Sequence, residues 1–172
     1  ADCCVTILYI QATGSGEGPD AKDITKWNEL RKVPGGKVAT SIDMRVQFIV
    51  ADEMAIRCGG KFSSNKNRAL VAEVRLGMGS TAPKLVIVKP QTYMNDSGNA
   101  VSPLAKYFNT PVEQIIVIHD ELDIPFNAIR VKIGGGDNGH NGLKSLTQSL
   151  SSPDYFRVRV GIGRPLTPQD TA

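Results

Sequence analysis

The sequence predicts an α/β fold, a single domain in which a mixed β-sheet is flanked by helices. Short β-branched and aliphatic runs alternate along the chain with segments whose apolar residues recur at helical spacing. This interleaving is typical of a sheet with helices packed on its faces. The 172 residues suit one domain, residues 1–172, with a sizeable core.

Strands are expected where such runs are too short for a helix. They are Val5–Ile10, Val46–Val50, Ala69–Leu76, Lys84–Val88, Ile115–Ile118 and Tyr155–Ile162. The last of these alternates, with Arg157 and Arg159 on the face opposite Val158. We therefore expect a half-buried strand with a basic solvent face.

Helices are expected where spacing or end signals favour them. The candidates are Asp20–Lys32, Asp52–Arg57, Ser97–Phe108, a turn after Thr110 and Asn141–Leu150. Asp52 and Glu53 put acids in a first turn, and Thr110-Pro111-Val112-Glu113 has capping-box form. Gly14, Gly16 and Gly18 follow the first strand as GxGxG, so a flexible loop is favoured there over a dinucleotide site.

Composition narrows the class of protein. A hydrophobic fraction of 41% with 22% charged residues is typical of a globular chain. The net charge of +3 permits a nucleic-acid partner without requiring one. Three cysteines without a CxxC motif favour a reduced, cytoplasmic setting. No run approaches the ~20 apolar residues of a membrane span, and no signal peptide is visible.

Polar residues gather after the run Ile115–Ile118 and again some fifteen residues later. The first group is His119, Asp120, Glu121 and Asp123, at a strand end where open α/β sheets bind ligands. The second is the glycine-rich stretch 134–142, which includes Asn138, His140 and Asn141. Such glycines suit positive φ or a backbone close to a ligand, and a sharp connection before a helix is the alternative.

Four blocks, in this order and spacing, resemble the bacterial peptidyl-tRNA hydrolase family. They are residues 89–98, 119–125, 134–144 and 157–165, and the match extends over about residues 48–165. The resemblance implies hydrolysis of the ester that joins a stalled peptide to tRNA. It also implies a cytoplasmic monomer that acts on peptidyl-tRNA without a metal or cofactor.

The resemblance also implies roles for individual residues. Asp120, Asn95 and Asn141 match catalytic positions, where an aspartate orients the base and carboxamides hold water or the carbonyl. The matched substrate-binding positions are Tyr93, Met94, Asn95, His140 and Asn141, with Lys132, Lys144, Arg157 and Arg159 as candidate phosphate contacts. The alternatives are a helix cap for Asn95, a turn role for Asp120 and solvated surface charge for the basic residues.

The chain departs from the family at the position of its base histidine, where Met44 or a gap stands. Residues 1–47 do not align, and the family's closing helix after Pro165 is largely absent. Asn127 and Asn138 replace glycines, and asparagine tolerates left-handed backbone. Two functions remain open: a hydrolase that uses another base, and an impaired member that binds the tRNA acceptor end without efficient hydrolysis.

Overall fold

The computed structural model describes residues 5–10, 50–78 and 83–163. Within these ranges one seven-stranded sheet has the spatial order β2-β3-β4-β1-β5-β7-β6. The strands are β1 (Val5–Ile10), β2 (Ser63–Asn65), β3 (Ala69–Arg75), β4 (Lys84–Pro90), β5 (Ile115–Glu121), β6 (Ile129–Ile133) and β7 (Phe156–Gly161). The predicted mixed sheet is confirmed.

The centre of the sheet is parallel. β1 pairs in parallel with β4 and with β5, and β5 pairs in parallel with β7. β3 and β6 join antiparallel on the two sides, and β2 extends the β3 side. The carboxyl ends of β4, β1, β5 and β7 therefore meet along one edge, the position at which α/β sheets bind ligands.

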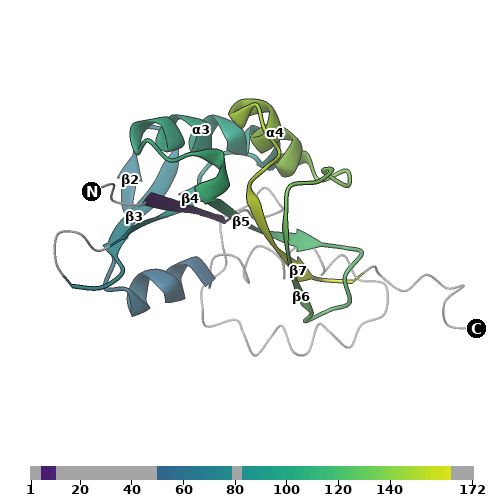
Figure 1. The fold of residues 1–172 in the computed structure, drawn as a ribbon, viewed down its shortest axis with the longest axis horizontal. Helices are drawn as coiled ribbons and strands as arrows, with labels where there is room; N and C mark the ends of the chain where they lie inside the picture. The colour runs from purple at the N-terminus through teal and green to yellow at the C-terminus, as the bar shows by residue number, and fades with distance from the viewer. Residues whose placement is uncertain (1–4, 11–49, 79–82, 164–172) are drawn as a thin grey trace, which may run out of the picture.

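Helices cover both faces of the sheet (Figure 1). α3 (Ser97–Tyr107) and α4 (Asn141–Leu150) pack on one face, and a helix over residues 50–57 lies on the other. Two short 3₁₀ turns, η2 (Met94–Asp96) and η3 (Val112–Gln114), precede α3 and β5. In the described ranges, no helix has both the length and the apolar character to cross a bilayer.

Each face has its own apolar core. Val86, Val117 and Leu104 belong to the cluster under α3 and α4, whereas Ala51 and Ile87 belong to the cluster under helix 50–57. Consecutive residues of β4 are buried because both faces of this strand are covered, which explains its unbroken apolar sequence. Burying each large aliphatic side chain contributes about 1.5–3 kcal/mol.

Glycine at position 98 allows α3 and α4 to approach closely. Its backbone N–H donates to Ser145 Oγ over 3.0 Å. A Cβ at this position would lie 2.2 Å from the Ser145 carbonyl oxygen. The contact fixes η2 and the start of α3 against α4. Predicted site residues lie in η2 and in α4.

Most predicted elements are present, with several differences. β1, β3, β4, α3 and α4 match their predicted ranges closely, and helix 50–57 contains the predicted Asp52–Arg57. Val50 is helical rather than the end of a strand, and 46–49 lie outside the described residues. The predictions for Gly14–Gly18 and Asp20–Lys32 also lie outside them. β2 and β6 were not predicted.

Two predictions about the central strands need correction. β5 continues to Glu121 because His119, Asp120 and Glu121 remain paired with β7, so they are not loop residues. Arg157 is 0% exposed, so the predicted basic solvent face of β7 is wrong at this residue. The alternation was correct, but α4 and the preceding loop cover the face on which Arg157 lies.

Two asparagines adopt the left-handed conformation that the sequence allowed. Asn127 has φ of 67° and Asn138 has φ of 47°. Asparagine reaches this region more readily than most residues. Both positions are therefore compatible with the glycines that they replace.

His119 makes folding stability depend on pH. The pKa of His119 is lowered from 6.5 to about 4, mainly by burial and to a smaller extent by the neighbouring His140. Between these values the unfolded chain binds more protons, so the unfolding free energy should fall as pH falls from 6.5 to 4, by up to about 3 kcal/mol. Urea unfolding across this range should show the loss. A His119→Asn variant, which does not titrate, should show a smaller loss, and an equal loss in both proteins contradicts the assignment.

Gly98→Ala should separate α3 from α4. The added methyl meets backbone rather than a flexible side chain, so a cost of about 1–3 kcal/mol is expected. Asn99→Ala, at the exposed neighbouring position, is the matched control and should leave the melting temperature nearly unchanged. Equal melting temperatures for the two variants would show that the helices can move apart freely.

Candidate functional site at the carboxyl edge of the sheet

Asp120 and His140 face each other at the carboxyl end of β5. Asp120 is on the strand, and His140 is the N-cap residue of α4. Asp120 Oδ1 lies 3.4 Å from His140 Nε2, and each side chain is only 11% exposed. The strand and the loop thus bring together a carboxylate and an imidazole that are twenty residues apart in sequence.

The hydrogen bond accepted by Nδ1, the other ring nitrogen of His140, determines which neutral tautomer the ring adopts. Nδ1 accepts a hydrogen bond from the Leu143 backbone N–H over 3.3 Å, so the ring acts as the helix cap. A neutral ring that accepts at Nδ1 carries its proton on Nε2, the nitrogen nearest Asp120. Asp120 therefore faces an N–H group, and the lone pair of Nδ1 is occupied by the cap.

A second imidazole packs against this pair. The rings of His119 and His140 lie perpendicular, with centroids 5.1 Å apart. His119 Nδ1 is 2.7 Å from the Asp120 carbonyl oxygen, so this nitrogen donates the hydrogen bond. His119 is 1% exposed and neutral near pH 7, because its pKa is lowered to about 4. It supports the position of the pair and does not itself reach solvent.

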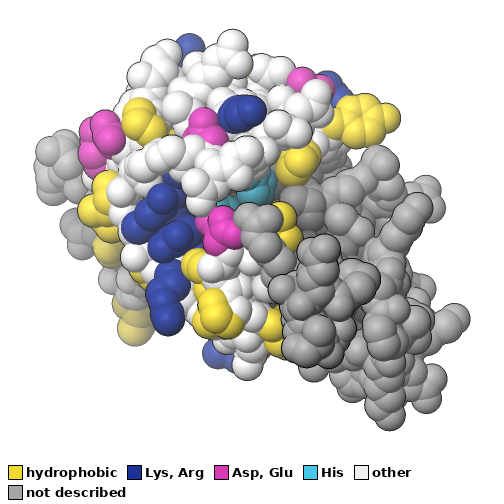
Figure 2. All heavy atoms as spheres, turned by 90° about the vertical axis from the view of Figure 1, so that its right-hand side faces the viewer, with side chains coloured by type: hydrophobic (Ala, Val, Ile, Leu, Met, Phe, Trp, Pro, Cys, Tyr) yellow, Lys and Arg dark blue, Asp and Glu magenta, His cyan; other side chains and the backbone are white. Residues whose placement is uncertain are grey.

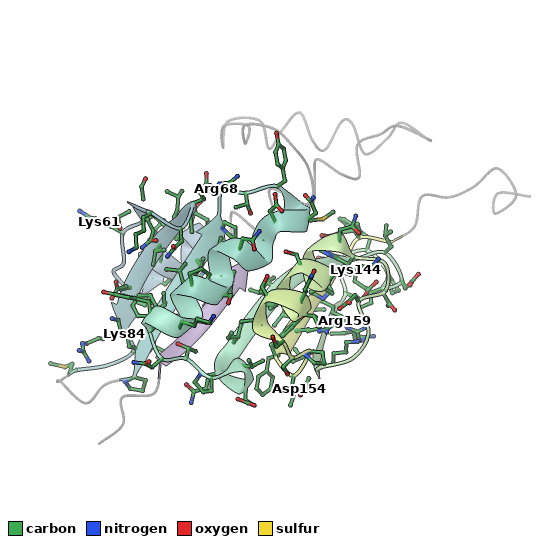
Figure 3. The ribbon with its side chains drawn as sticks, turned by 90° about the horizontal axis from the view of Figure 1, so that it is seen from above. Lys61, Arg68, Lys84, Lys144, Asp154 and Arg159 are labelled. Atoms are coloured by element: carbon green, nitrogen blue, oxygen red, sulfur yellow. The ribbon has the colours of Figure 1, made fainter. Side chains whose placement is uncertain are left out.

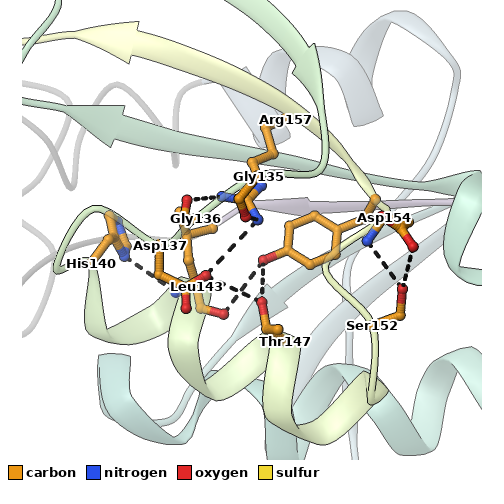
Figure 4. A network of polar contacts seen from close by, with 10 residues as sticks. Gly135, Gly136, Asp137, His140, Leu143, Thr147, Ser152, Asp154 and Arg157 are labelled. Atoms are coloured by element: carbon orange, nitrogen blue, oxygen red, sulfur yellow. Dashed lines mark hydrogen bonds and ion pairs between the residues drawn. The ribbon is translucent and has the colours of Figure 1, made fainter.

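A glycine-rich loop brings His140 and Asn141 to this edge. Gly134, Gly135 and Gly139 have φ of 60°, 98° and 76°, values that L side chains rarely adopt. The buried Arg157 donates to the carbonyls of Gly135 and Gly136, each over 2.7 Å (Figure 4). The glycines thus have a conformational role here, in agreement with their predicted positive φ.

The segment after β4 contains the other predicted site residues. Tyr93 is 65% exposed and directly precedes η2, which contains Met94 and the exposed Asn95. Asn95 does not cap α3, because the N-cap is Asp96 and no side chain caps this helix. η2 packs against α4, so Asn95 and Asn141 belong to segments that touch each other.

Basic residues lie beside the histidines, on strands β6 and β7. Lys132 pairs across the strands with Arg157, and Arg130 pairs with Arg159. Figure 2 shows Lys and Arg side chains gathered on one side of the histidine surface. Lys144, in the first turn of α4, lies on the same side of the molecule as Arg159 (Figure 3).

The pKa of Lys132 is lowered, mainly by burial of its ammonium group and to a smaller extent by the positive charges of Arg157 and Arg159. Arg159 is partly neutralised by Glu121, whose Oε2 is 3.9 Å from Arg159 Nη1. Positive charge is thus concentrated beside Asp120 and His140, where an anion would be favoured.

Two parts of this arrangement were not predicted from the sequence. His140 was predicted as a substrate-binding residue of the loop, whereas its ring also faces Asp120. Arg157 was predicted on the solvent face of its strand, although it is buried. The apolar run ending at His119 was a signal for a buried imidazole, because the same strand continues beyond it.

Two further observations concern the described residues outside this arrangement. A shallow hollow between the ends of α3 and α4 is lined by Lys106, Asn109 and Leu150, among others. Because α3 begins at the carboxyl edge and ends before β5, this hollow is at the opposite end of the sheet from Asp120. Within the described ranges, no group of three or more His, Cys, Asp or Glu residues could hold a metal ion.

Comparison with known proteins agrees with the resemblance in the sequence blocks. The sequence model of the peptidyl-tRNA hydrolase family matches residues 44–172. A peptidyl-tRNA hydrolase of Renibacterium salmoninarum is 56% identical over 120 residues, which cover 70% of this chain and 61% of that protein. One of Mycobacterium avium is 50% identical over 127 residues, covering 74% of this chain and 65% of that protein.

Solved structures give the same result. The crystal structure of peptidyl-tRNA hydrolase from Acinetobacter baumannii superposes with a TM-score of 0.68 at 26% identity, covering 96% of this chain and 71% of that one. The chain spans a little under two thirds of the length of the curated relatives it matches. With the family model matching most of its residues, the chain belongs to the peptidyl-tRNA hydrolase family.

Proposed function

We propose that the protein hydrolyses the ester bond between peptide and tRNA in peptidyl-tRNA, which returns tRNA from stalled translation. Membership of the family supports this activity. The observation on which the proposal depends is the Asp120 carboxylate, 3.4 Å from His140 Nε2 at the carboxyl edge of the sheet.

Ester hydrolysis requires a group that takes a proton from water and returns one to the leaving oxygen. The Asp120 carboxylate is proposed to take the proton from water and to return it, because His140 presents Nε2–H to this carboxylate while its Nδ1 caps α4. The family's base position, at or near Met44, lies outside the described residues, so this pair is the acid–base machinery proposed from the described part.

Asn95 and Asn141 are proposed to hold the attacking water and the ester carbonyl. A carboxamide offers donors and an acceptor and does not titrate. Both side chains belong to exposed residues, on segments that contact each other. A donor aimed at the developing oxyanion contributes about 10²–10³ in rate in other enzymes.

The RNA end is proposed to lie across the basic side of the site. Lys132 and Lys144 would contact phosphates, Arg159 would add to them, and the exposed Tyr93 with Met94 would pack on the terminal nucleoside. α4 has no acid in its first turn and has Lys144 there instead. A cation is unfavourable near the positive end of a helix, so a phosphate bound here would offset that cost.

The remaining parts of the proposal follow from the substrate. Residues 1–172 act as one domain and as a monomer, in the cytoplasm, where translation supplies peptidyl-tRNA. No metal or cofactor is needed for the residues described to act. The alternative, a member that binds the acceptor end without efficient hydrolysis, receives no support from the relatives, which are named as hydrolases.

Release of a labelled N-acetylaminoacyl group from tRNA by the purified chain tests the proposal. Asp120→Ala and His140→Ala should each lower kcat/KM by about 10²–10⁴, the usual size of an acid–base contribution. Asn95→Ala and Asn141→Ala should each lower it by about 10²–10³.

Asn99→Ala removes an exposed carboxamide on the neighbouring helix α3 and should retain full activity. Two results would contradict the proposal. One is turnover that is indifferent to the substitution of Asp120 and of both site asparagines. The other is a chain that binds the labelled tRNA but leaves the ester intact.

A further inference from the structure

Arg157 is a buried cation that the proposed chemistry does not use. Its side chain is 1% exposed, and its guanidinium lies 4.7 Å from the centre of the Tyr155 ring. Burial of an unpaired charge is costly, so a retained buried arginine requires strong acceptors. The described acceptors are two neutral carbonyls and, at 3.9 Å, the carboxylate of Asp137.

Both carbonyls belong to the loop that leads to His140. Nη1 donates to Gly136 O and Nη2 donates to Gly135 O, each over 2.7 Å. The planar fork of the guanidinium fixes two successive peptide groups at once, which the single ammonium of lysine does not reproduce. This loop has glycines in left-handed conformations and therefore few side chains of its own to hold it in place.

The rest of the loop is anchored from Asp137 (Figure 4). Thr147 Oγ1 donates to Asp137 Oδ1 over 3.3 Å and lies 3.0 Å from the Tyr155 hydroxyl. The His140 backbone N–H donates to Asp137 O over 2.8 Å. A continuous series of contacts therefore links the Arg157 guanidinium to the backbone of His140 through three loop residues.

We propose that Arg157 is a positioning residue: its guanidinium holds the 134–140 loop so that His140 faces Asp120 and Asn141 begins α4 at the site. Its effect on turnover rests on the proposed function, whereas its effect on His140 does not. A displacement of about 1 Å at a reacting group can cost 10²-fold in rate. The cations that would bind RNA are other residues, so substrate affinity should change much less than kcat.

Arg157→Lys tests the proposal because it keeps the charge and loses the fork. In ¹⁵N NMR spectra, the wild-type His140 ring should show the Nε2–H tautomer. The variant should show a mixture of tautomers and shifted amide signals at Gly135, Gly136 and Asp137. Its kcat should fall by about 10²-fold with KM within about threefold of wild type.

Leu104→Ala is the control for general destabilisation, because Leu104 is fully buried in the core and belongs to α3. At a temperature where it is folded, it should keep the wild-type His140 signals and kcat. Arg157 has no positioning role if Arg157→Lys also keeps the wild-type signals. The same holds if Leu104→Ala reproduces the changes seen in Arg157→Lys.

A second pair of variants decides the question if Arg157→Lys does not fold. Gly135→Ala strains the held peptide, because its φ of +98° is a conformation that L side chains rarely adopt. A Cβ at Gly136 meets nothing within 4 Å. Gly135→Ala should therefore shift the His140 signals and Gly136→Ala should not; equal spectra would overturn the proposal. If the wild type does not hydrolyse the ester, the proposed function fails and these spectra still decide the role of Arg157.

Discussion

The parallel pairing of β1 with β4 and β5, continued by β5 with β7, is the constraint on which the site depends. Parallel strands end on the same edge, so residues from distant parts of the sequence meet there without long-range loops. Asp120 is the last residue but one of β5, Tyr93 and Asn95 follow β4, and Arg159 lies on β7. The described helices bury the two faces of the sheet.

The glycine-rich loop adds what the sheet does not provide. It turns from the edge strand β6 into α4 and brings an imidazole against the carboxylate at the end of β5. His140 has two structural tasks here, since one nitrogen caps α4 and the other faces Asp120. The hydrogen bond at Nδ1 restrains the ring, which favours a fixed site over one that forms only when substrate binds.

Much of the fold was predictable because local pattern and burial agree. The apolar run 115–118, the helical spacing of α3 and the polar start of α4 each specify one element. The burial of Arg157 was not predictable, because alternation tells which residues share a face and not what covers that face. β6 was missed although Ile129, Val131 and Ile133 alternate with polar residues, a pattern that predicts a strand. The alternation is misleading only about burial, because all three apolar side chains are exposed.

The site, like the fold, was predictable only where a local sequence pattern specifies it. Sequence blocks predicted roles for Asp120, Asn95 and Asn141, but the contact between Asp120 and His140 depends on loop geometry that no local pattern specifies. The most direct measurement is an NMR titration of the labelled chain with a short RNA that ends in CCA and bears an amide-linked aminoacyl group. The largest shifts should be at Tyr93–Asn95, Asp120, His140–Lys144 and Lys132. Shifts centred instead on Lys106, Asn109 and Leu150, at the opposite end of the sheet, would contradict the account.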